Sequence, residues 1–320
     1  MADGEKTFVI GSRDSTLAVR QSEIVMAYLE KYHPKIRLRL ETMKTTGDRI
    51  LDRRLYEIGG KGLFVKELDQ ALREGRIDLS VHSMKDMPIE TPGDLPVIGC
   101  SRREDPRDVL VLPAGSESGE PDPDIDKLID YSKPIGTSSR RRILQLQELF
   151  PKARFESVRG NLATRLRKLD EGQYSALILA GAGLKRLGLE NRISRYFEVE
   201  EVVPSACQGI LALQGRKNED YRFLAGFSSR ESAFAAAAER AFIRTLGGGC
   251  SSPVGAYAEI FWDGADALMT LYGFYYDEEN QRSYRKKAQT MVGDTQDCAR
   301  AGRDLAQGIL EEAGKGYFQE

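Results

Sequence analysis

Short apolar runs alternate with amphipathic stretches along the N-terminal part of the chain. The runs predict strands at residues 7–12, 36–41 and 77–83. Apolar positions spaced three and four residues apart predict helices at 16–32 and at 64–75, where Gly75 provides the C-cap. This β-α-β-α-β order favours an α/β layer with a parallel sheet.

The same alternation continues in the middle of the chain. A strand at 108–112 precedes an exposed loop rich in proline, glycine and acidic residues at 113–126. Beyond the loop, the pattern predicts strands and helices in turn, with strands at 133–139, 154–159 and 175–181 and helices at 139–150 and 161–171. Two α/β units of similar size therefore precede residue 204.

A third region begins near residue 228 and has a different order of elements. A strong helix at 228–246 is followed by apolar strands at 254–260 and 267–276, and a final helix covers 295–312. Strands grouped between helices predict a small α+β domain.

Composition and charge narrow the class of protein. The length of 320 residues predicts about two domains. The composition, 41% hydrophobic and 30% charged, is that of an ordinary globular protein. The 47 basic and 49 acidic residues nearly cancel, which argues against a nucleic-acid partner. No apolar run approaches the roughly 20 residues of a membrane span, and the first residues lack the features of a signal peptide. We therefore expect a cytoplasmic protein.

The four cysteines are scattered, and only two histidines accompany them, so no metal site is expected. Cys100 and Cys298 lie in apolar or helical settings that predict inert, packed thiols, and the role of Cys207 stays open. Cys250 follows three glycines and precedes Pro253, which predicts an accessible thiol. Without a nearby histidine, this thiol fits a covalent attachment point better than a Cys-His hydrolase.

Arginines recur just after the predicted strands. In a parallel sheet these turns meet at one edge, where helix N-termini and guanidinium groups bind anions. Each arginine alone is equally well explained as a solvated or salt-bridged surface residue. Together with neighbouring hydroxyl and amide side chains they predict a site for a small polyanion, either phosphate or carboxylate, formed by Arg13, Arg140, Arg141, Arg142, Arg159, Arg165 and Arg186 with Thr137, Ser138, Ser139 and Asn161.

One carboxylate stands out in the segment "VHSMKDMP" at residues 81–88. Asp86 lies on a turn at a strand end, where it serves either as an ordinary turn residue or as a general acid-base or stabiliser of positive charge. His82 is expected to be a structural, hydrogen-bonded histidine. Two glycine-rich segments, "AGAGLKRLG" and "GGKG", lack the spacing of dinucleotide-binding and P-loop fingerprints.

Taken together, these segments resemble the hydroxymethylbilane synthase family, also called porphobilinogen deaminase. The resemblance covers residues 8–312 and rests on many motifs in one order, including "GSRDSTLAVRQ", "GGKGLFVKELDQAL", "DLSVHSMKDMP", "REDPRDVLV", "GTSSRRR", "VRGNLATRL", "ACQGILAL" and "GGGCSSPVGAYA". It implies two α/β lobes like those of type II periplasmic binding proteins and a smaller C-terminal α+β domain. The implied domains are residues 1–104 with 208–227, residues 105–207, and residues 228–320.

The resemblance also implies a reaction and a cofactor. The expected enzyme is a transferase that polymerises four porphobilinogen molecules head to tail into the linear tetrapyrrole hydroxymethylbilane, releasing ammonia at each step. Its cofactor is dipyrromethane, joined by a thioether to the residue that is Cys250 here, and Asp86 is the implied catalytic carboxylate. The implied enzyme is a monomer that needs no metal.

The resemblance further assigns residues to ligand binding. Those implied to bind the cofactor are Lys61, Ser83, Lys85, Asp86, Thr137, Ser138, Ser139, Arg141, Arg142 and Gln208. Those implied to bind substrate or the growing chain are Arg13, Ser15, Gln21, Arg159, Gly160, Asn161, Arg165 and Arg186.

Three positions depart from the family pattern. Glu57 stands where some relatives have lysine, and Cys207 replaces a small residue, which makes it a candidate second reactive thiol. Arg140 occupies a position that is often apolar in the family and is left out of the site.

Two other functions fit the sequence less well. A non-enzymatic anion receptor would need neither the third domain nor Cys250, and a nucleic-acid-binding protein would carry aromatic residues among its arginines.

Overall fold

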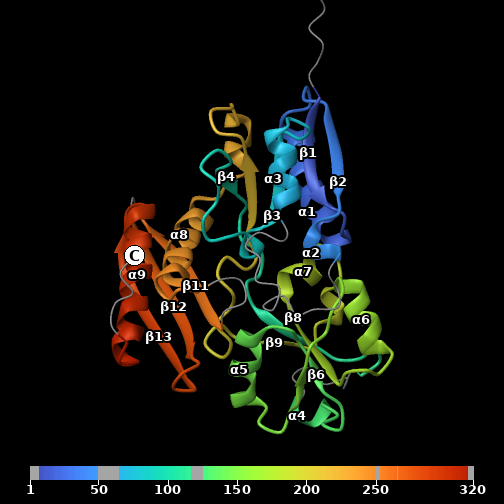
Figure 1. Ribbon diagram of the computed structural model, residues 1–320, viewed down its shortest axis with the longest axis vertical. Coiled ribbons are helices and arrows are strands. Elements are labelled where there is room, and N and C mark those ends of the chain that lie inside the picture. Colours follow the sequence, from blue (N-terminus) through green and yellow to red (C-terminus); the bar gives the residue numbers. More distant parts are fainter. Residues whose placement is uncertain (1–6, 50–64, 117–124, 249–252, 265, 316–320) are drawn as a thin grey trace, which may run out of the picture. The chain divides into compact units, whose positions relative to one another are not determined.

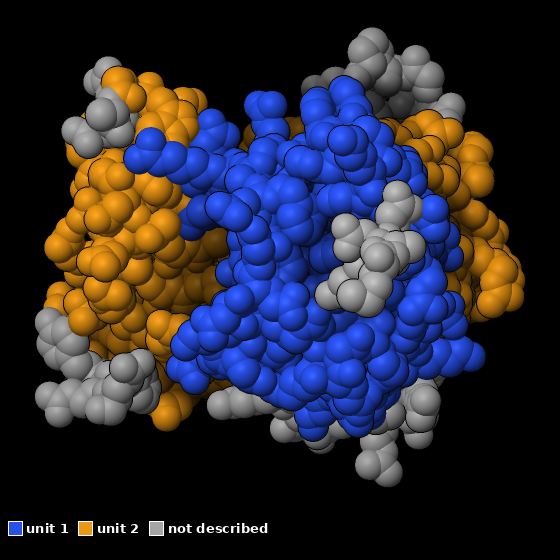
Figure 2. All heavy atoms as spheres, turned by 90° about the horizontal axis from the view of Figure 1, so that it is seen from above, with its two compact units in different colours: residues 1–104, 210–233 blue, residues 105–209, 234–320 orange. Residues whose placement is uncertain are grey.

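The computed structural model describes residues 7–49, 65–116, 125–248, 253–264 and 266–315. The chain divides into two compact units, each built from two separate stretches of sequence. Unit 1 comprises Met1–Glu104 and Ile210–Ala233, and unit 2 comprises Asp105–Gly209 and Phe234–Glu320. Figure 1 shows the elements in sequence colours, and Figure 2 distinguishes the two units.

Unit 1 contains a five-stranded sheet. Its strand order is β2 (Leu38–Met43), β1 (Phe8–Arg13), β3 (Leu79–Ser83), β10 (Leu211–Gly215) and β4 (Val97–Cys100). Strand β1 runs parallel to β2 and β3, whereas β10 runs antiparallel to both of its neighbours. The remaining elements are α1 (Thr16–Tyr32), α2 (Thr46–Arg49), α3 (Lys66–Arg73) and the 3-10 turns η1 (Met84–Asp86) and η3 (Arg222–Phe227).

Helices cover this sheet because their apolar side chains lie on one stripe. Helix α1 begins where the Ser15 hydroxyl accepts a hydrogen bond from the Ala18 N–H, and it buries Val25 and Leu29. These two side chains form one core cluster with apolar residues of β1, β3 and β10. A second cluster holds α3, through Leu68 and Leu72, together with β1. These two clusters hold β1 and β3 between α1 and α3, and so fix the positions at which the two strands end.

The larger sheet of unit 2 has the same arrangement of strand directions as the sheet of unit 1. Its strand order is β7 (Phe155–Glu156), β6 (Ile135–Gly136), β8 (Ala176–Ala180), β5 (Asp108–Val111) and β9 (Arg195–Tyr196). Strand β6 is parallel to β7 and β8, and β5 is antiparallel to β8 and β9. The other elements are α4 (Ile125–Leu128), α5 (Arg140–Leu149), α6 (Leu162–Asp170), α7 (Gly181–Arg186) and η2 (Glu190–Arg192).

The predicted α/β class is confirmed, but the prediction of a parallel sheet is wrong for one strand in the five-stranded sheet of each unit. The exceptions are β5 and β10, which come shortly after the chain enters unit 2 at Asp105 and re-enters unit 1 at Ile210. A strand that arrives from the other unit needs no crossover helix within its own sheet, so it is free to run in the opposite direction.

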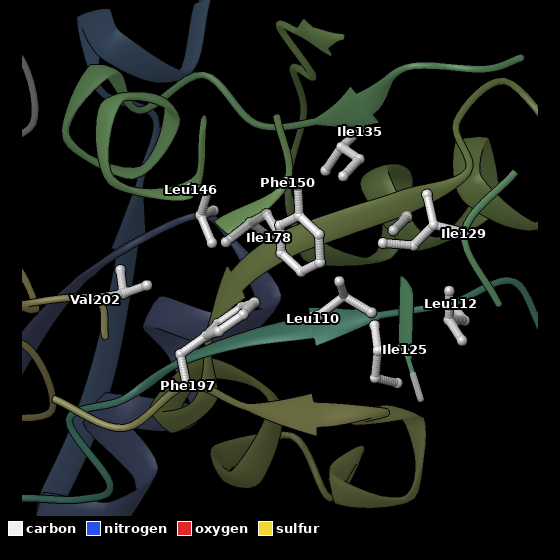
Figure 3. Packing of buried hydrophobic residues seen from close by; sticks show 11 residues of the cluster. Leu110, Leu112, Ile125, Ile129, Ile135, Leu146, Phe150, Ile178, Phe197 and Val202 are labelled. Carbon is white, nitrogen blue, oxygen red and sulfur yellow. The ribbon is translucent and has the colours of Figure 1, made fainter. Parts of the chain in front are cut away.

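The core of unit 2 is made by side chains from both parts of this mixed sheet. Figure 3 shows Leu110 of β5 and Ile178 of β8 beside the rings of Phe150 and Phe197. The two rings meet edge to face, with centroids 6.2 Å apart and planes at 75°. Because all four side chains are almost completely buried, they fix the central strands against α5 and the segment after β9.

The C-terminal part of unit 2 is a separate three-stranded antiparallel sheet. Its strands are β11 (Val254–Asp263), β12 (Asp266–Asp277) and β13 (Arg282–Val292), and helices α8 (Arg230–Thr245) and α9 (Thr295–Glu312) cover one face (Figure 1). The α+β prediction is confirmed, but β13 was not predicted. Of its 11 residues only Tyr284 and Val292 are buried. Because most positions of this strand face solvent, its sequence needs no apolar run, and the pattern that predicts a strand is missing.

Candidate active site

The candidate catalytic carboxylate lies directly after a central strand of unit 1. Asp86 ends the turn η1, which follows β3 without a gap. The backbone N–H of Met84 donates a 2.9 Å hydrogen bond to the Ile210 carbonyl, and Met84 and Met87 are buried. Asp86 itself is half-buried, and within the described part of the chain its carboxylate has no hydrogen-bond or salt-bridge partner. The fold therefore holds the backbone firmly and leaves the carboxylate available to a ligand.

Other predicted residues gather at the same edge of unit 1. Because β1 and β3 are adjacent and parallel, Arg13 at the end of β1 and Ser83 at the end of β3 share this edge. The buried Gln21 side chain of α1 donates a 2.8 Å hydrogen bond to the Ser83 hydroxyl. Ser15 caps α1, and Lys85 lies between Ser83 and Asp86 in η1.

His82 is a structural residue, as predicted. Its ring is buried, and Nε2 lies 2.9 Å from the Ser80 hydroxyl and 3.1 Å from the Gln214 side-chain oxygen. Burial lowers the pKa of His82 to about 4, and the nearby charge of Arg13 acts in the same direction. The ring is therefore neutral at physiological pH and links β3 to β10.

In unit 2 the predicted hydroxyl residues precede helix α5. Ser139 is its N-cap, and its hydroxyl faces the Arg142 N–H at 3.5 Å. The buried Thr137 hydroxyl accepts a hydrogen bond from the Ser139 N–H at 3.3 Å. The Ser138 hydroxyl donates to the Val158 carbonyl at 2.8 Å. These contacts fix the turn between β6 and α5. The first N–H groups of α5, which have no partner within the helix itself, point out of its N-terminal end.

Arg141 and Arg142, the second and third residues of α5, converge on a carboxylate that the sequence analysis missed. Asp108, the first residue of β5, is fully buried. Its Oδ1 accepts hydrogen bonds from Arg142 Nη2 at 2.7 Å and from the Gln208 side chain at 2.9 Å, and its Oδ2 lies 2.7 Å from Arg141 Nη2. Burial opposes ionisation of Asp108, but the two guanidinium groups outweigh it and hold its pKa below the usual range.

The remaining predicted residues of unit 2 lie after β7 and β8. Asn161 is the N-cap of α6 and accepts a 2.9 Å hydrogen bond from the Thr164 N–H. Gly160 has a φ of +113°, which an L side chain rarely adopts, and its carbonyl accepts a 2.8 Å hydrogen bond from Arg165 Nε. Arg159 precedes this turn. Arg186 ends α7, where its Nη2 donates to the Gly209 carbonyl at 2.6 Å.

The predicted residues Lys61 and Cys250, and the departure Glu57, lie outside the described residues. The other three cysteines are free and buried. The prediction that Cys100 and Cys298 are packed is confirmed, and burial raises the pKa of the Cys100 thiol to about 11 and that of Cys298 to about 12, which disfavours the reactive thiolate. Cys207 is also buried and has a left-handed backbone, with φ of 61°. Its burial does not favour the idea of a second reactive thiol.

The donor chemistry of these residues fits a cofactor that carries several carboxylates. In unit 2, arginine and hydroxyl side chains and two helix N-termini lie at the strand ends. In unit 1, arginine, lysine and hydroxyl side chains lie at the strand ends, and the Asp86 carboxylate has no partner among the described residues. Each unit therefore has an α/β sheet with groups suited to bind anions at the ends of its strands. Within the described residues, every helix is too short or too polar to cross a membrane.

Comparison with known proteins names the family. The model "Porphobilinogen deaminase, dipyromethane cofactor binding domain" matches residues 8–223, and "Porphobilinogen deaminase, C-terminal domain" matches residues 233–311. The porphobilinogen deaminase of Alkaliphilus oremlandii is 54% identical over 297 residues, covering 93% of this chain and 94% of the relative. That of Acetivibrio thermocellus is 50% identical over 304 residues, covering 95% and 98%. The chain belongs to the porphobilinogen deaminase family, and its cofactor is dipyrromethane.

Solved structures show more distant similarity. The periplasmic sulphonate binding protein SsuA of Escherichia coli has 13% identity and a TM-score of 0.36, with 74% of this chain and 70% of that chain covered. A substrate binding domain of a putative amino acid ABC transporter from Streptococcus pneumoniae has 11% identity and a TM-score of 0.41, with 69% and 90% covered.

Proposed function

We propose that this protein joins four porphobilinogen molecules head to tail into hydroxymethylbilane, with Asp86 as its catalytic carboxylate and Cys250 as the attachment point of dipyrromethane. The reaction and the cofactor follow from the family. The assignments of the described residues rest on the positions given above, whereas those of Lys61 and Cys250 rest on the resemblance of the sequence to the family. The observation that supports the role of Asp86 is its half-buried carboxylate, which has no hydrogen-bond or salt-bridge partner among the described residues.

Asp86 acts on charge that develops in the substrate. When porphobilinogen loses ammonia, positive charge spreads to its pyrrole nitrogen, and a fixed carboxylate stabilises that charge. A new carbon–carbon bond then joins the aminomethyl carbon of the substrate to the free α-carbon of the terminal pyrrole, and that α-carbon loses a proton. Asp86 is suited to move this proton because no donor among the described residues occupies its oxygens. Dipyrromethane, when bound, supplies the first such α-carbon.

The cationic and hydroxyl side chains bind carboxylates. Each porphobilinogen carries an acetate and a propionate, so negative charge accumulates as the chain grows, and arginine forks suit planar carboxylates. We assign to the cofactor Lys61, Ser83, Lys85, Thr137, Ser138, Ser139, Arg141, Arg142 and Gln208, with Asp86. We assign to the substrate and growing chain Arg13, Ser15, Gln21, Arg159, Gly160, Asn161, Arg165 and Arg186.

We also propose three domains: residues 1–104 with 208–227, residues 105–207, and residues 228–320. The presence of three separate sheets supports this division. The protein is proposed to act as a cytoplasmic monomer on a small-molecule substrate, without a nucleic-acid or membrane partner. Cys100, Cys207 and Cys298 are buried and form no disulfide within the described part of the chain, which suits a reducing compartment.

Incubation of the purified protein with porphobilinogen tests the function. We expect one ammonia to be released for each porphobilinogen consumed, and a linear tetrapyrrole to be the product identified by mass spectrometry. Consumption without ammonia, or a dipyrrole as the released product, would contradict the proposal.

A further inference from the structure

We propose that Asp108 is a positioning residue for the cofactor site: its carboxylate fixes the orientations of Arg141, Arg142 and Gln208. This inference rests on the proposed function, because it takes these three side chains to serve carboxylate binding. Asp108 itself is fully buried, so it acts through the side chains that it holds and not by contact with a ligand.

The geometry around Asp108 is tight and comes from three separate segments. Oδ1 accepts from Arg142 Nε at 3.0 Å and Nη2 at 2.7 Å, and Oδ2 lies 2.7 Å from Arg141 Nη2. Gln208 Nε2 donates both to Asp108 Oδ1 at 2.9 Å and to the Pro106 carbonyl at 2.7 Å. Asp108 therefore links the start of β5, the first turn of α5 and the segment that leaves unit 2.

The other guanidinium donors are bound to fixed acceptors. Arg141 Nη1 donates to the Val203 carbonyl at 2.7 Å and Nε to the Ser205 hydroxyl at 3.1 Å, while Arg142 Nη1 donates to the Ile178 carbonyl at 3.0 Å. Both arginines are almost fully buried, with 2% and 8% of their surfaces exposed. Each guanidinium is thus anchored at several points, and Asp108 is the anchor that they share.

Charge argues that the cluster is more than a structural ion pair. Two guanidinium groups share one carboxylate, so the cluster keeps one positive charge in excess, and a buried unpaired charge is costly. In addition, Arg140, Arg141 and Arg142 occupy the first turn of α5, where the positive end of the helix dipole disfavours cations. An anionic ligand bound close to this turn would reduce both the cost of the excess buried charge and the repulsion from the helix dipole. If the cluster served stability alone, one arginine paired with one carboxylate would be the more favourable arrangement.

Unit 1 provides a matched control for a purely structural carboxylate. Asp78 is also buried, with 6% of its surface exposed. Its Oδ1 accepts from Arg216 Nη2 at 2.8 Å, and its Oδ2 accepts from the Val9 N–H at 2.9 Å. Asp78 precedes β3, whereas those proposed ligand-binding residues of unit 1 that the structure describes lie at or beyond the far ends of β1 and β3. Asp78→Asn therefore removes a buried carboxylate of similar kind away from the proposed cofactor contacts.

The experiment compares Asp108→Asn with Asp78→Asn in the full-length protein as purified. Both variants are expected to melt at lower temperature. Only Asp108→Asn should also lose most of the two-pyrrole adduct seen by intact mass, and its KM for porphobilinogen should rise about 10-fold or more, as expected for a lost charge-assisted contact. If Asp108→Asn melts lower but keeps a full adduct and a normal KM, Asp108 is purely structural and the proposal is overturned.

Asp108→Glu covers the case in which Asp108→Asn fails to fold. It keeps the charge but moves the carboxylate by one methylene, so we expect a folded protein with a reduced adduct and a raised KM. A folded Asp108→Glu protein with a full adduct and normal KM would show that charge balance suffices, and would overturn the positioning role. If the wild-type protein carries no adduct and forms no tetrapyrrole, it is the proposed function that fails.

Discussion

The Gln21 side chain donates a 2.8 Å hydrogen bond to the Ser83 hydroxyl, which joins helix α1 to the last residue of strand β3. The two residues are 62 positions apart in the sequence, and both were assigned to ligand binding. Ser83 is followed at once by the turn that carries Asp86. The contact therefore ties the turn that carries Asp86 to helix α1, which begins just after β1.

Removal of this hydrogen bond should weaken the fold by a modest, measurable amount. In a double-mutant cycle with Gln21→Leu and Ser83→Ala, we expect a coupling energy of about 1 kcal/mol in the free energy of unfolding, measured by urea denaturation. Additive effects of the two substitutions would show that the contact contributes nothing to stability.

Asp86→Asn should abolish most of the catalysis and leave the fold intact. The amide has nearly the same size but can neither stabilise positive charge nor accept a proton, so we expect ammonia release to fall by about 100-fold or more. The melting temperature should change little, because Asp86 has no partner within the described residues. Near-normal release of ammonia by Asp86→Asn would contradict the assigned role.

The buried His82 predicts a loss of stability in acid. Its pKa is lowered from 6.5 to about 4, so the unfolded chain binds a proton that the folded protein does not. The free energy of unfolding should fall as the pH drops from 6.5 to about 4, with this group contributing on the order of 3 kcal/mol. His82→Gln should reduce this slope in urea denaturation between these pH values. An unchanged slope would mean that other groups cause the acid sensitivity.

Much of the local structure could be predicted from the sequence. The predicted helices at 16–32 and 295–312 match α1 and α9 in full, because both have clear apolar stripes and polar N-caps at Ser15 and Asp294. The turns that carry Ser139 and Asn161 were also placed correctly, since capping residues mark helix starts in the sequence.

Other features depend on contacts between distant segments. The direction of β5 and β10 is set by where the chain enters each unit, which no local pattern records. Strand β13 is mostly exposed, so it lacks an apolar signal. Asp108 was missed because its partners Arg141 and Gln208 are distant in sequence. The charged residue at the start of the otherwise apolar strand "DVLV" is the sequence feature from which a buried ion pair could have been predicted.

Intact mass of the denatured protein, purified without added substrate, tests the central claim most directly. We predict a covalent mass increase equal to two pyrrole units in the wild-type protein and its absence in Cys250→Ser, which should also be inactive. Wild-type protein of unmodified mass that still converts porphobilinogen to a tetrapyrrole would contradict the account.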